Sequence, residues 1–181
     1  CAVRRVKEGT GATLVQSGWQ DGMWVYAMEC YCFLRNVVDV LSNGMTAYKM
    51  RFGIDFPGPL IPFGSSVEYK PASDKDKARV HGLSNQLLNG IFMGYHQQHG
   101  GGWSGDVYVA DVDEIEAAES LNDIHVKRFN APEVFLVKIA DRWHFPLADG
   151  DVCQPGQVDH WNFLVYLTCD VFSRDFMLQI W

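Results

Sequence analysis

The chain lacks most of the signatures by which enzymes and membrane proteins are recognised in a sequence. No run of eighteen apolar residues occurs, and the most apolar stretch, Trp161 to Cys169, is interrupted by Asn162. A membrane-spanning helix is therefore not expected. There is no G-x-S-x-G motif and no glycine-rich loop that ends in Gly-Lys-Ser or Gly-Lys-Thr. These absences argue against a serine hydrolase of the nucleophile-elbow type and against a P-loop nucleotide site.

Cysteine pairs with the spacing of a zinc site are also missing. The five cysteines, an odd number, include no C-x-x-C pair. We expect reduced thiols and, since no signal peptide is present, an intracellular protein of the cytoplasm or nucleus. The first residue is Cys1 and not Met, which favours a fragment or a processed product.

Positive charge is scarce. Lys and Arg total 15 against 22 Asp and Glu, which gives a net charge of -7. Residues 1–56 carry a net charge of +1, whereas residues 57–138 and 139–181 carry -4 each. This balance argues against a generally basic nucleic-acid binder, so any contact with phosphate has to come from local groups of cations.

The first third of the chain has the pattern of helices. Residues 2–17 form one predicted helix with Gly18 as its C-cap. A second is predicted from Asp21, as N-cap, to about Leu41. Its apolar stripe recurs at steps of three and four residues: Trp24, Ala27, Met28, Tyr31, Leu34, Val38 and Leu41. A short third helix begins after Thr46 and ends at Gly53.

The period changes after Phe56-Pro57-Gly58-Pro59, where we place a domain boundary. The remaining residues to about 150 predict short strands with a glycine-rich hairpin turn at 100–105 and one acidic helix from Asp113 to Ser120. The candidate strands are 61–70, 90–96, 106–111, 123–129, 133–140 and 142–147. The predicted class is α+β, with helices at residues 1–56, a small β-barrel at 57–150 and an apolar tail at 151–181.

Several side-chain groups have a functional and a structural interpretation. His96 and His99 have too few neighbouring ligands for a metal site, so a turn with two exposed imidazoles is favoured. The acids Asp111, Asp113, Glu114 and Glu116 could bind Mg²⁺, but acids adjacent in sequence usually form a solvated face. Cys30 and Cys32 are interpreted as thiols in or beside the core. We predict no catalytic residue and no metal ligand in this chain.

Local groups of cations are the candidates for phosphate contact, since Lys and Arg can neutralise phosphate and Arg can bind it bidentately. One group lies on the first predicted helix, one in the linker after residue 70 and one on a later strand. They are Arg4, Arg5, Lys7, Lys75, Lys77, Arg79, Lys127 and Arg128. The alternative is a solvated surface, because Asp74 and Asp76 interleave with the lysines of the linker.

A series of motifs resembles the integrase of copia-type retrotransposons. Residues 2–10, AVRRVKEGT, resemble the helix after the last catalytic glutamate of that family, and residues 28–36, MECYCFLRN, resemble its next helix. Thr46-Ala47-Tyr48-Lys49 to Phe52-Gly53 is similar to its T-P-Y-E…F-G motif, with Ala47 and Lys49 departing from the usual pattern. Pro62-Phe63-Gly64 to Tyr69 and Gly90-Ile91-Phe92-Met93-Gly94-Tyr95 resemble the SH3-like barrel segment after the integrase core, and residues 106–111 and 124–135 resemble its closing strands.

The resemblance covers residues 2–150 and implies the C-terminal part of an integrase in a pol polyprotein. The helices would belong to the edge of an RNase H-like core, followed by an SH3-like barrel. The family enzyme is a polynucleotidyl transferase whose three carboxylates bind two divalent metals. All three catalytic acids would lie before Cys1, so the chain is expected to be inactive alone and to hold no cofactor.

Two functions follow from this resemblance. The chain would bind nucleic acid or the rest of the polyprotein during DNA integration. Alternatively, it would be a structural or adaptor subunit derived from such an element and held in a larger assembly, which the acidic balance and the apolar tail favour. An independent metal-dependent nuclease is disfavoured.

Overall fold

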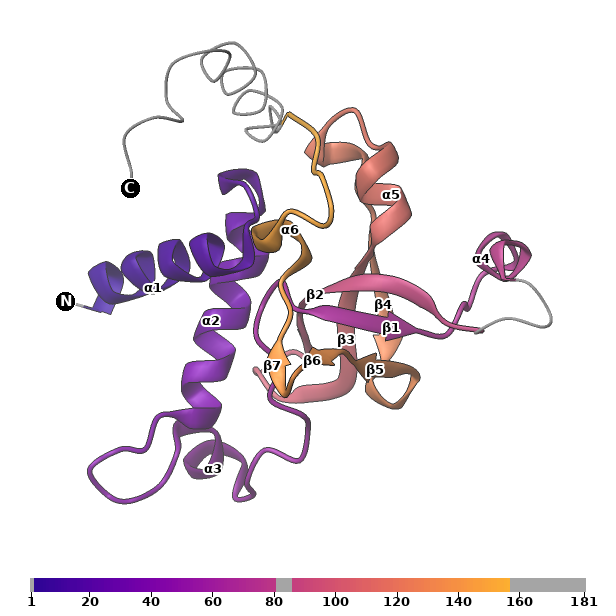
Figure 1. The fold of residues 1–181 in the computed structure, drawn as a ribbon. Coiled ribbons are helices and arrows are strands. Elements are labelled where there is room, and N and C mark those ends of the chain that lie inside the picture. The colour runs from indigo at the N-terminus through magenta and orange to yellow at the C-terminus, as the bar shows by residue number, and fades with distance from the viewer. Residues whose placement is uncertain (1, 81–85, 157–181) are drawn as a thin grey trace, which may run out of the picture.

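The computed structural model describes residues 2–80 and 86–156, and it confirms a mixed α+β fold. The long helices lie beside an antiparallel sheet formed by the later residues (Figure 1). The helices are α1 (Ala2–Ser17), α2 (Trp24–Val38), α3 (Ala47–Phe52), α4 (Asp74–Arg79), α5 (Val112–Ala117) and α6 (Pro146–Asp149). The strands are β1 (Ser66–Tyr69), β2 (Leu88–Gln97), β3 (Trp103–Asp111), β4 (Val126–Asn130), β5 (Val134–Leu136), β6 (Lys138–Ile139) and β7 (Arg142–Trp143).

The first and third predicted helices are confirmed together with their caps. α1 ends at Gly18, whose φ of 77° only glycine adopts easily and whose amide donates to the carbonyl of Leu14 at 3.0 Å. A Cβ at Gly18 would lie 2.3 Å from the backbone nitrogen of Ala148, so α6 packs closely against this end of α1. The Thr46 hydroxyl caps α3 by accepting from the amide of Lys49, and Gly53 closes it.

The prediction for the second helix is wrong at both ends, and it identifies the buried face only in part, through Ala27 and the half-buried Leu34. Asp21 does not cap α2 but begins a 3-10 turn, Asp21–Met23, that precedes it. The helix ends at Val38, since Asp39 is already extended. Its buried residues are Ala27, Cys30 and Phe33, whereas Trp24 and Val38 of the predicted stripe are each 52% exposed. The helix is apolar on more than one face, so spacing alone does not identify the buried one.

The main sheet has the strand order β4-β3-β2-β1-β5, with every neighbouring pair antiparallel. β2 and β3 form the predicted glycine hairpin, in which the Gln98 amide donates to the carbonyl of Gly102. After β4, the 3-10 turn Ala131–Glu133 returns the chain so that β5 pairs with β1. β6 and β7 form a separate two-stranded hairpin.

The predicted strand at residues 61–70 is shorter than expected. Only Ser66–Tyr69 has strand geometry, because Pro62 has no amide hydrogen and Gly64 has a φ of 81°. The irregular part still lies beside β2, since the amide of Gly64 donates to the carbonyl of Phe92 at 2.8 Å. A Cβ at Gly64 would lie 2.2 Å from the Cβ of Ser17, so this segment also packs on the end of α1.

The predicted basic linker is in part a helix, α4. The hydroxyl of Ser73 caps it by accepting from the amide of Asp76 at 3.1 Å. Asp74 and Asp76 lie in the first turn and Lys77 and Arg79 in the last, so the charges complement the helix dipole. The acids that interleave with the lysines therefore have a structural role.

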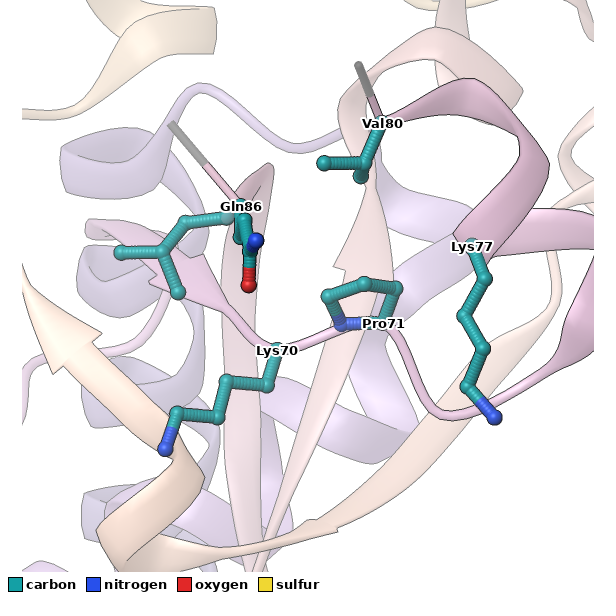
Figure 2. A pocket seen from close by; sticks show the side chains of 6 residues that line it. Lys70, Pro71, Lys77, Val80 and Gln86 are labelled. Atoms are coloured by element: carbon teal, nitrogen blue, oxygen red, sulfur yellow. The ribbon is translucent and has the colours of Figure 1, made fainter. Parts of the chain in front are cut away.

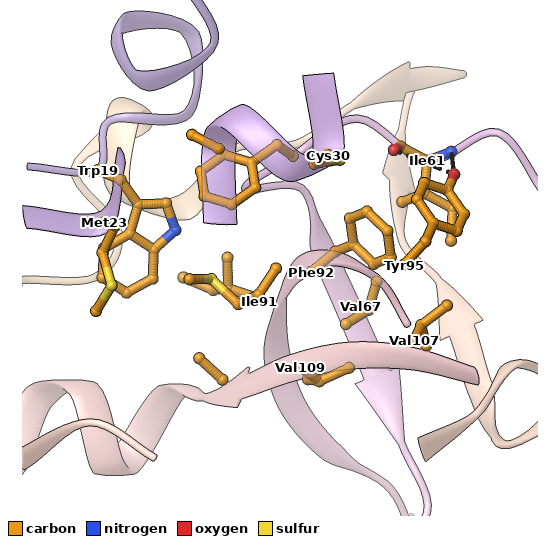
Figure 3. Close-up of a cluster of buried hydrophobic side chains, with 14 of the residues drawn as sticks. Trp19, Met23, Cys30, Ile61, Val67, Ile91, Phe92, Tyr95, Val107 and Val109 are labelled. Atoms are coloured by element: carbon orange, nitrogen blue, oxygen red, sulfur yellow. Dashed lines mark hydrogen bonds between the residues drawn. The ribbon is translucent and has the colours of Figure 1, made fainter. Parts of the chain in front are cut away.

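One cluster of buried side chains joins the helices to the sheet (Figure 3). It includes Cys30 from α2, Val67 from β1, Phe92 from β2 and Val109 from β3. Phe33 packs against Tyr95 with ring centroids 4.6 Å apart, and it also contacts Tyr48 and Phe56. The domain boundary near residue 57 stays a prediction. Buried residues from both sides of it belong to the same core cluster. The tail lies outside the described residues from position 157 on.

Candidate functional site

Arg79, at the end of α4, is the centre of a network of ion pairs. Its Nη1 donates to Asp111 Oδ2 at 2.8 Å and its Nη2 to Asp111 Oδ1 at 3.1 Å, which makes a bidentate pair. Nη2 also donates to the carboxylate of Asp113, and Nη1 lies 3.5 Å from Asp76 Oδ1. The helix after β1 is thereby fixed to the end of β3 and the start of α5.

Asp111 is the buried member of this network, with a fully buried side chain. Burial alone would raise its pKa, but hydrogen bonds from Arg79, from the Tyr69 hydroxyl and from the amide of Glu114 hold the pKa of Asp111 below its usual value. Burial and the bond to this carboxylate raise the pKa of Tyr69, and the bond to Asp111 raises the pKa of Arg79. The interpretation of Asp111 as part of a solvated face is wrong.

Lys127 of β4 extends the network on its other side. Its Nζ lies 3.4 Å from Asp76 Oδ1 and 3.6 Å from Glu114 Oε2, while His125 Nδ1 lies 2.9 Å from Glu114 Oε1. These groups line a hollow of about 510 Å³ between α4, α5 and β4, together with Ser73 and Lys75. Cations and carboxylates alternate around it, so the hollow is polar but offers no uniform positive surface to phosphate.

A second polar cluster, on the other face of β4, resembles a nucleophile with its base but is not arranged as one. His96 Nδ1 lies 2.7 Å from Ser104 Oγ, and Arg128 Nη1 lies 3.2 Å from His96 Nε2. Because the guanidinium can only donate, Nε2 accepts and Nδ1–H donates to Ser104. Ser104 in turn donates to the carbonyl of His96 at 3.0 Å, with the Asp106 carboxylate farther away at 3.4 Å, so the imidazole does not accept its proton. His96 is also half-buried, which corrects the prediction of two exposed imidazoles.

The structure brings only some of the predicted phosphate-binding residues together. Lys75, Arg79 and Lys127 line the hollow just described. Arg128 points to the opposite face of β4 and pairs with Asp106 at 2.8 Å. Lys77 pairs with Asp74 at 3.5 Å.

The three candidates on α1 form a separate exposed group. Arg4 pairs with Glu8 at 2.7 Å, and Arg5 and Lys7 are exposed. Among the residues that the structure describes, no carboxylate pairs with Arg5, Lys7 or Lys75. Five of the eight candidates are thus already neutralised by carboxylates of the same chain.

A further hollow, of about 420 Å³, lies beside the end of β1 (Figure 2). Its lining includes the apolar Pro71 and Val80, with Lys70 and Lys77 on either side. Figure 2 shows the two ammonium groups directed away from each other across Pro71, so they do not converge on one anion. Lys70 lies over the ring of Phe135 at 5.8 Å.

The cysteines behave as predicted where they are described. Cys30 is buried, which raises the pKa of its thiol, and Cys32 is half-buried. Within residues 2–80 and 86–156, no group of three or more His, Cys, Asp or Glu side chains is placed to hold a metal ion. In the same residues, no helix has both the length and the apolar character needed to cross a membrane.

Most of the exposed large apolar side chains belong to the N-terminal helical half, residues 2–60. Among the described residues, fifteen large apolar side chains are exposed, and only three of these, Phe135, Leu136 and Ile139, belong to the later part. The others are Val3, Val15, Trp24, Val25, Val38, Val40, Leu41, Met45, Met50, Phe52, Ile54 and Leu60. Beside α2, a mainly apolar groove of about 370 Å³ is lined by Leu34, Val38, Leu60 and Trp143.

Sequence reasoning missed Tyr69, Asp76 and Asp106 as members of these polar networks. A usable signal existed for Asp111, because alternation in the predicted strand 106–111 puts it on the same face as Val107 and Val109. An acid on an apolar face needs a partner, and Arg79 was available in the linker. No comparable pattern indicates Asp76, whose carboxylate lies beside Arg79 and Lys127.

Comparison with known proteins identifies no relative. No protein-family model matches the chain, and neither the curated proteins nor the solved structures give a significant match.

Proposed function

We propose that this chain is the non-catalytic C-terminal part of a copia-type retrotransposon integrase and that it binds the rest of the polyprotein during DNA integration. The helices would belong to the edge of an RNase H-like core, and β1 to β5 would form the SH3-like barrel. No catalytic step is assigned to its residues. The divalent metals of the family enzyme would be held by acids outside this chain.

The strand order supports the barrel. Four strands follow one another as a meander, and the last strand returns through a 3-10 turn to pair with the first. Such a return brings the ends of a short sheet towards closure, as a small barrel requires. The motif Gly90 to Tyr95 lies within β2, where Ile91, Phe92, Met93 and Tyr95 are buried, so the residues that carry the resemblance are core residues.

The observation that carries the proposed binding to the polyprotein is the apolar surface of residues 2–60. Isolated apolar residues on a surface are ordinary, but twelve exposed large apolar side chains within residues 2–60 are more than a free surface of that size usually carries, which favours an interface. The proposed occupant is the remainder of the integrase core, since the helices that carry this surface are the ones that resemble the core's edge.

Contact with nucleic acid is the weaker part of the proposal. Arg79 and Lys127 are held by carboxylates, and the chain as a whole is acidic. Phosphate contact would rest on Arg5, Lys7 and Lys75. Binding of duplex DNA should therefore be weak and should fall steeply as salt rises. Affinity that does not change with ionic strength would contradict this contact.

The experiment that tests the proposal starts from the coding sequence upstream of Cys1. An Asp…Asp…Glu core is expected there, and its absence would overturn the assignment to an integrase. The core and this chain are then expressed as separate proteins and mixed, with their association measured by size-exclusion chromatography. A complex is expected at micromolar concentrations, since the exposed apolar side chains become buried. Separate elution of the two proteins at those concentrations would count against the proposed interface.

The adaptor function remains the second candidate, favoured by the internal neutralisation of the cations. It differs in one observable respect. An adaptor derived from such an element would have no catalytic core encoded upstream, and the isolated chain would associate with subunits of another assembly. A monomer without any partner would count against it.

A further inference from the structure

A small hollow of about 200 Å³ lies where α2 and α3 meet the glycine hairpin of β2 and β3. Its aromatic lining comes from Phe33 of α2 and from Tyr48 and Phe52 of α3, and the ring centroids of Tyr48 and Phe52 lie 4.7 Å apart. Phe33 and Tyr48 belong to the buried core, whereas Phe52 is exposed. One side of the hollow is therefore held rigidly by packed rings.

The remaining lining consists of polar side chains that can donate hydrogen bonds. Arg51 comes from α3, Asn36 from α2 and Gln97 from the end of β2. Within the described part of the chain, no carboxylate pairs with Arg51, and the side-chain amides of Asn36 and Gln97 make no hydrogen bond. A Cβ at Gly101 would lie 3.7 Å from Arg51 Nη1 and 3.9 Å from Gln97 Oε1, so both groups approach the hairpin. These donors are thus available to a ligand.

The hydroxyl of Tyr48 is a further donor without a partner. Tyr48 is only 7% exposed, and the described residues provide no hydrogen bond to its hydroxyl. Buried tyrosines normally satisfy this group. Among the described residues, the unpaired side-chain atoms that are also closed off from solvent are Trp19 Nε1 and Glu114 Oε2, so the Tyr48 hydroxyl keeps accessible surface. Since Tyr48 lines the hollow, its hydroxyl can reach a molecule bound there.

The hollow carries one uncompensated positive charge. Of the described residues that line it, Arg51 alone is charged, and its guanidinium lies over the ring of Phe52 at 5.6 Å, which restricts its orientation. In the hollow between α4 and α5, by contrast, the cations Arg79 and Lys127 already face carboxylates. A ligand that matches the hollow beside Arg51 is therefore an anion.

A single carboxylate fits this hollow better than a phosphate chain. One guanidinium neutralises one charge, and its planar fork matches a planar carboxylate in a bidentate pair. The net charge of -7 repels a polyanion such as nucleic acid more strongly than it repels one carboxylate. The packed rings would also contact the methylene groups of an acidic side chain, and a glutamate has two of them.

We propose that this hollow binds the carboxylate of a glutamate side chain from a partner protein, with Arg51 as its counter-ion and the Tyr48 hydroxyl as a second donor. The amides of Asn36 and Gln97 lie at the rim and can turn their NH₂ groups towards the same carboxylate. This inference does not depend on the proposed function in integration, because neither the apolar groove beside α2 nor an integrase core enters it.

The test is a titration of the whole ¹⁵N-labelled chain with the α-amide of N-acetyl-glutamate, followed by amide chemical shifts in NMR spectra at constant ionic strength. Saturable shifts are expected at the amides of residues 47–53 and 97–102. The neutral compound N-acetyl-glutaminamide should produce none there. An absence of saturable shifts, or equal shifts with the neutral compound, would overturn the proposal. Tighter binding of methyl phosphate at the same amides would overturn the choice of a carboxylate.

A matched pair of variants tests the counter-ion. Arg51→Gln replaces an exposed side chain and should raise the Kd for the glutamate compound about tenfold, because a charged donor becomes a neutral amide. Lys7→Gln removes the same charge from an exposed position of α1 outside the lining of the hollow, and its Kd should match that of the unchanged chain. Equal Kd values for the two variants would overturn the assignment of Arg51.

Tyr48→Phe tests the second donor. The hydroxyl has no partner in the free chain, so its removal should affect binding more than folding. The Kd for the glutamate compound should rise about threefold, as expected for one lost hydrogen bond. A Kd equal to that of the unchanged chain would overturn the role of the Tyr48 hydroxyl.

Discussion

The helical half of the molecule, residues 2–60, and the sheet half, residues 61–152, have complementary surfaces. The three buried carboxylates, Asp76, Asp106 and Asp111, all belong to the described part of the sheet half, where cations of the same half neutralise them. The helical half has no buried charge among its described residues but exposes twelve large apolar side chains. The sheet half therefore neutralises its buried carboxylates internally, whereas the helical half exposes apolar surface.

The comparison also explains why a group of basic residues in a sequence is a poor guide to phosphate binding. Arg79 and Lys127 come from segments about fifty residues apart, and each meets carboxylates from segments that are distant in sequence. The cations of α1 pair only locally, as Arg4 does with Glu8, or not at all among the described residues. Charges that fold into a network serve stability, and those on an isolated helix stay available.

The largest effect is expected when the buried network of the sheet half loses its central cation. Arg79→Met should lower the free energy of unfolding by about 3–5 kcal/mol, since the fully buried carboxylate of Asp111 is left without its counter-ion. The matched change in the helical half is Lys49→Met, which removes the exposed pair with Asp55 and should cost about 0.5 kcal/mol or less. Urea denaturation measures both, and equal losses would abolish the contrast between the halves.

The same network should make stability sensitive to acid. The pKa of Asp111 is lowered in the folded state, so its contribution is fully present above its unfolded pKa of about 4 and is lost as the pH falls through the lower folded value. Each unit of difference between the two pKa values is equivalent to about 1.4 kcal/mol. Urea titrations from about pH 6 to pH 2 should show the unchanged chain converging on Asp111→Asn as the pH falls. Parallel curves would rule out Asp111 as the sensitive group.

A smaller effect is expected at the aromatic joint between the halves. The amide of Ile61 donates to the Tyr95 hydroxyl at 2.7 Å, and this hydroxyl donates to the carbonyl of Pro59 at 2.8 Å. Tyr95→Phe leaves both backbone groups unpaired and should cost about 1–3 kcal/mol in thermal or urea unfolding. Tyr48→Phe is the control, because the described residues provide no hydrogen bond to the Tyr48 hydroxyl. A similar cost in both variants would show that the two hydrogen bonds of the Tyr95 hydroxyl contribute nothing beyond the loss of an unbonded hydroxyl.

Local patterns predicted local structure well, and contacts between distant segments account for what they missed. The caps Gly18, Thr46 and Gly53 and the glycine hairpin follow from nearest-neighbour chemistry, and all are observed. The buried face of α2 was predicted only in part because apolar residues lie on more than one of its faces, and the choice of face is made by the sheet that it packs on. The network around Arg79 depends on pairing between α4 and the end of β3, which no local period encodes.

The smallest effect on stability is expected on the exposed surface of the helical half, where the effect on binding should be large. Val38 and Leu41 are 52% and 44% exposed, so replacing both by Lys buries no new charge and should change the free energy of unfolding by only about 0.5 kcal/mol. If the proposed function holds, the same double variant should abolish association with the proposed integrase core in size-exclusion chromatography, because two charges would enter an apolar interface. Val15→Lys is the control on α1, because Val15 is 83% exposed and lines neither the groove beside α2 nor the hollow that Leu41 shares with α1. Loss of association in the control alone would move the interface to α1, and a loss of stability well above 1 kcal/mol in the double variant would show that these residues belong to the core of the isolated chain.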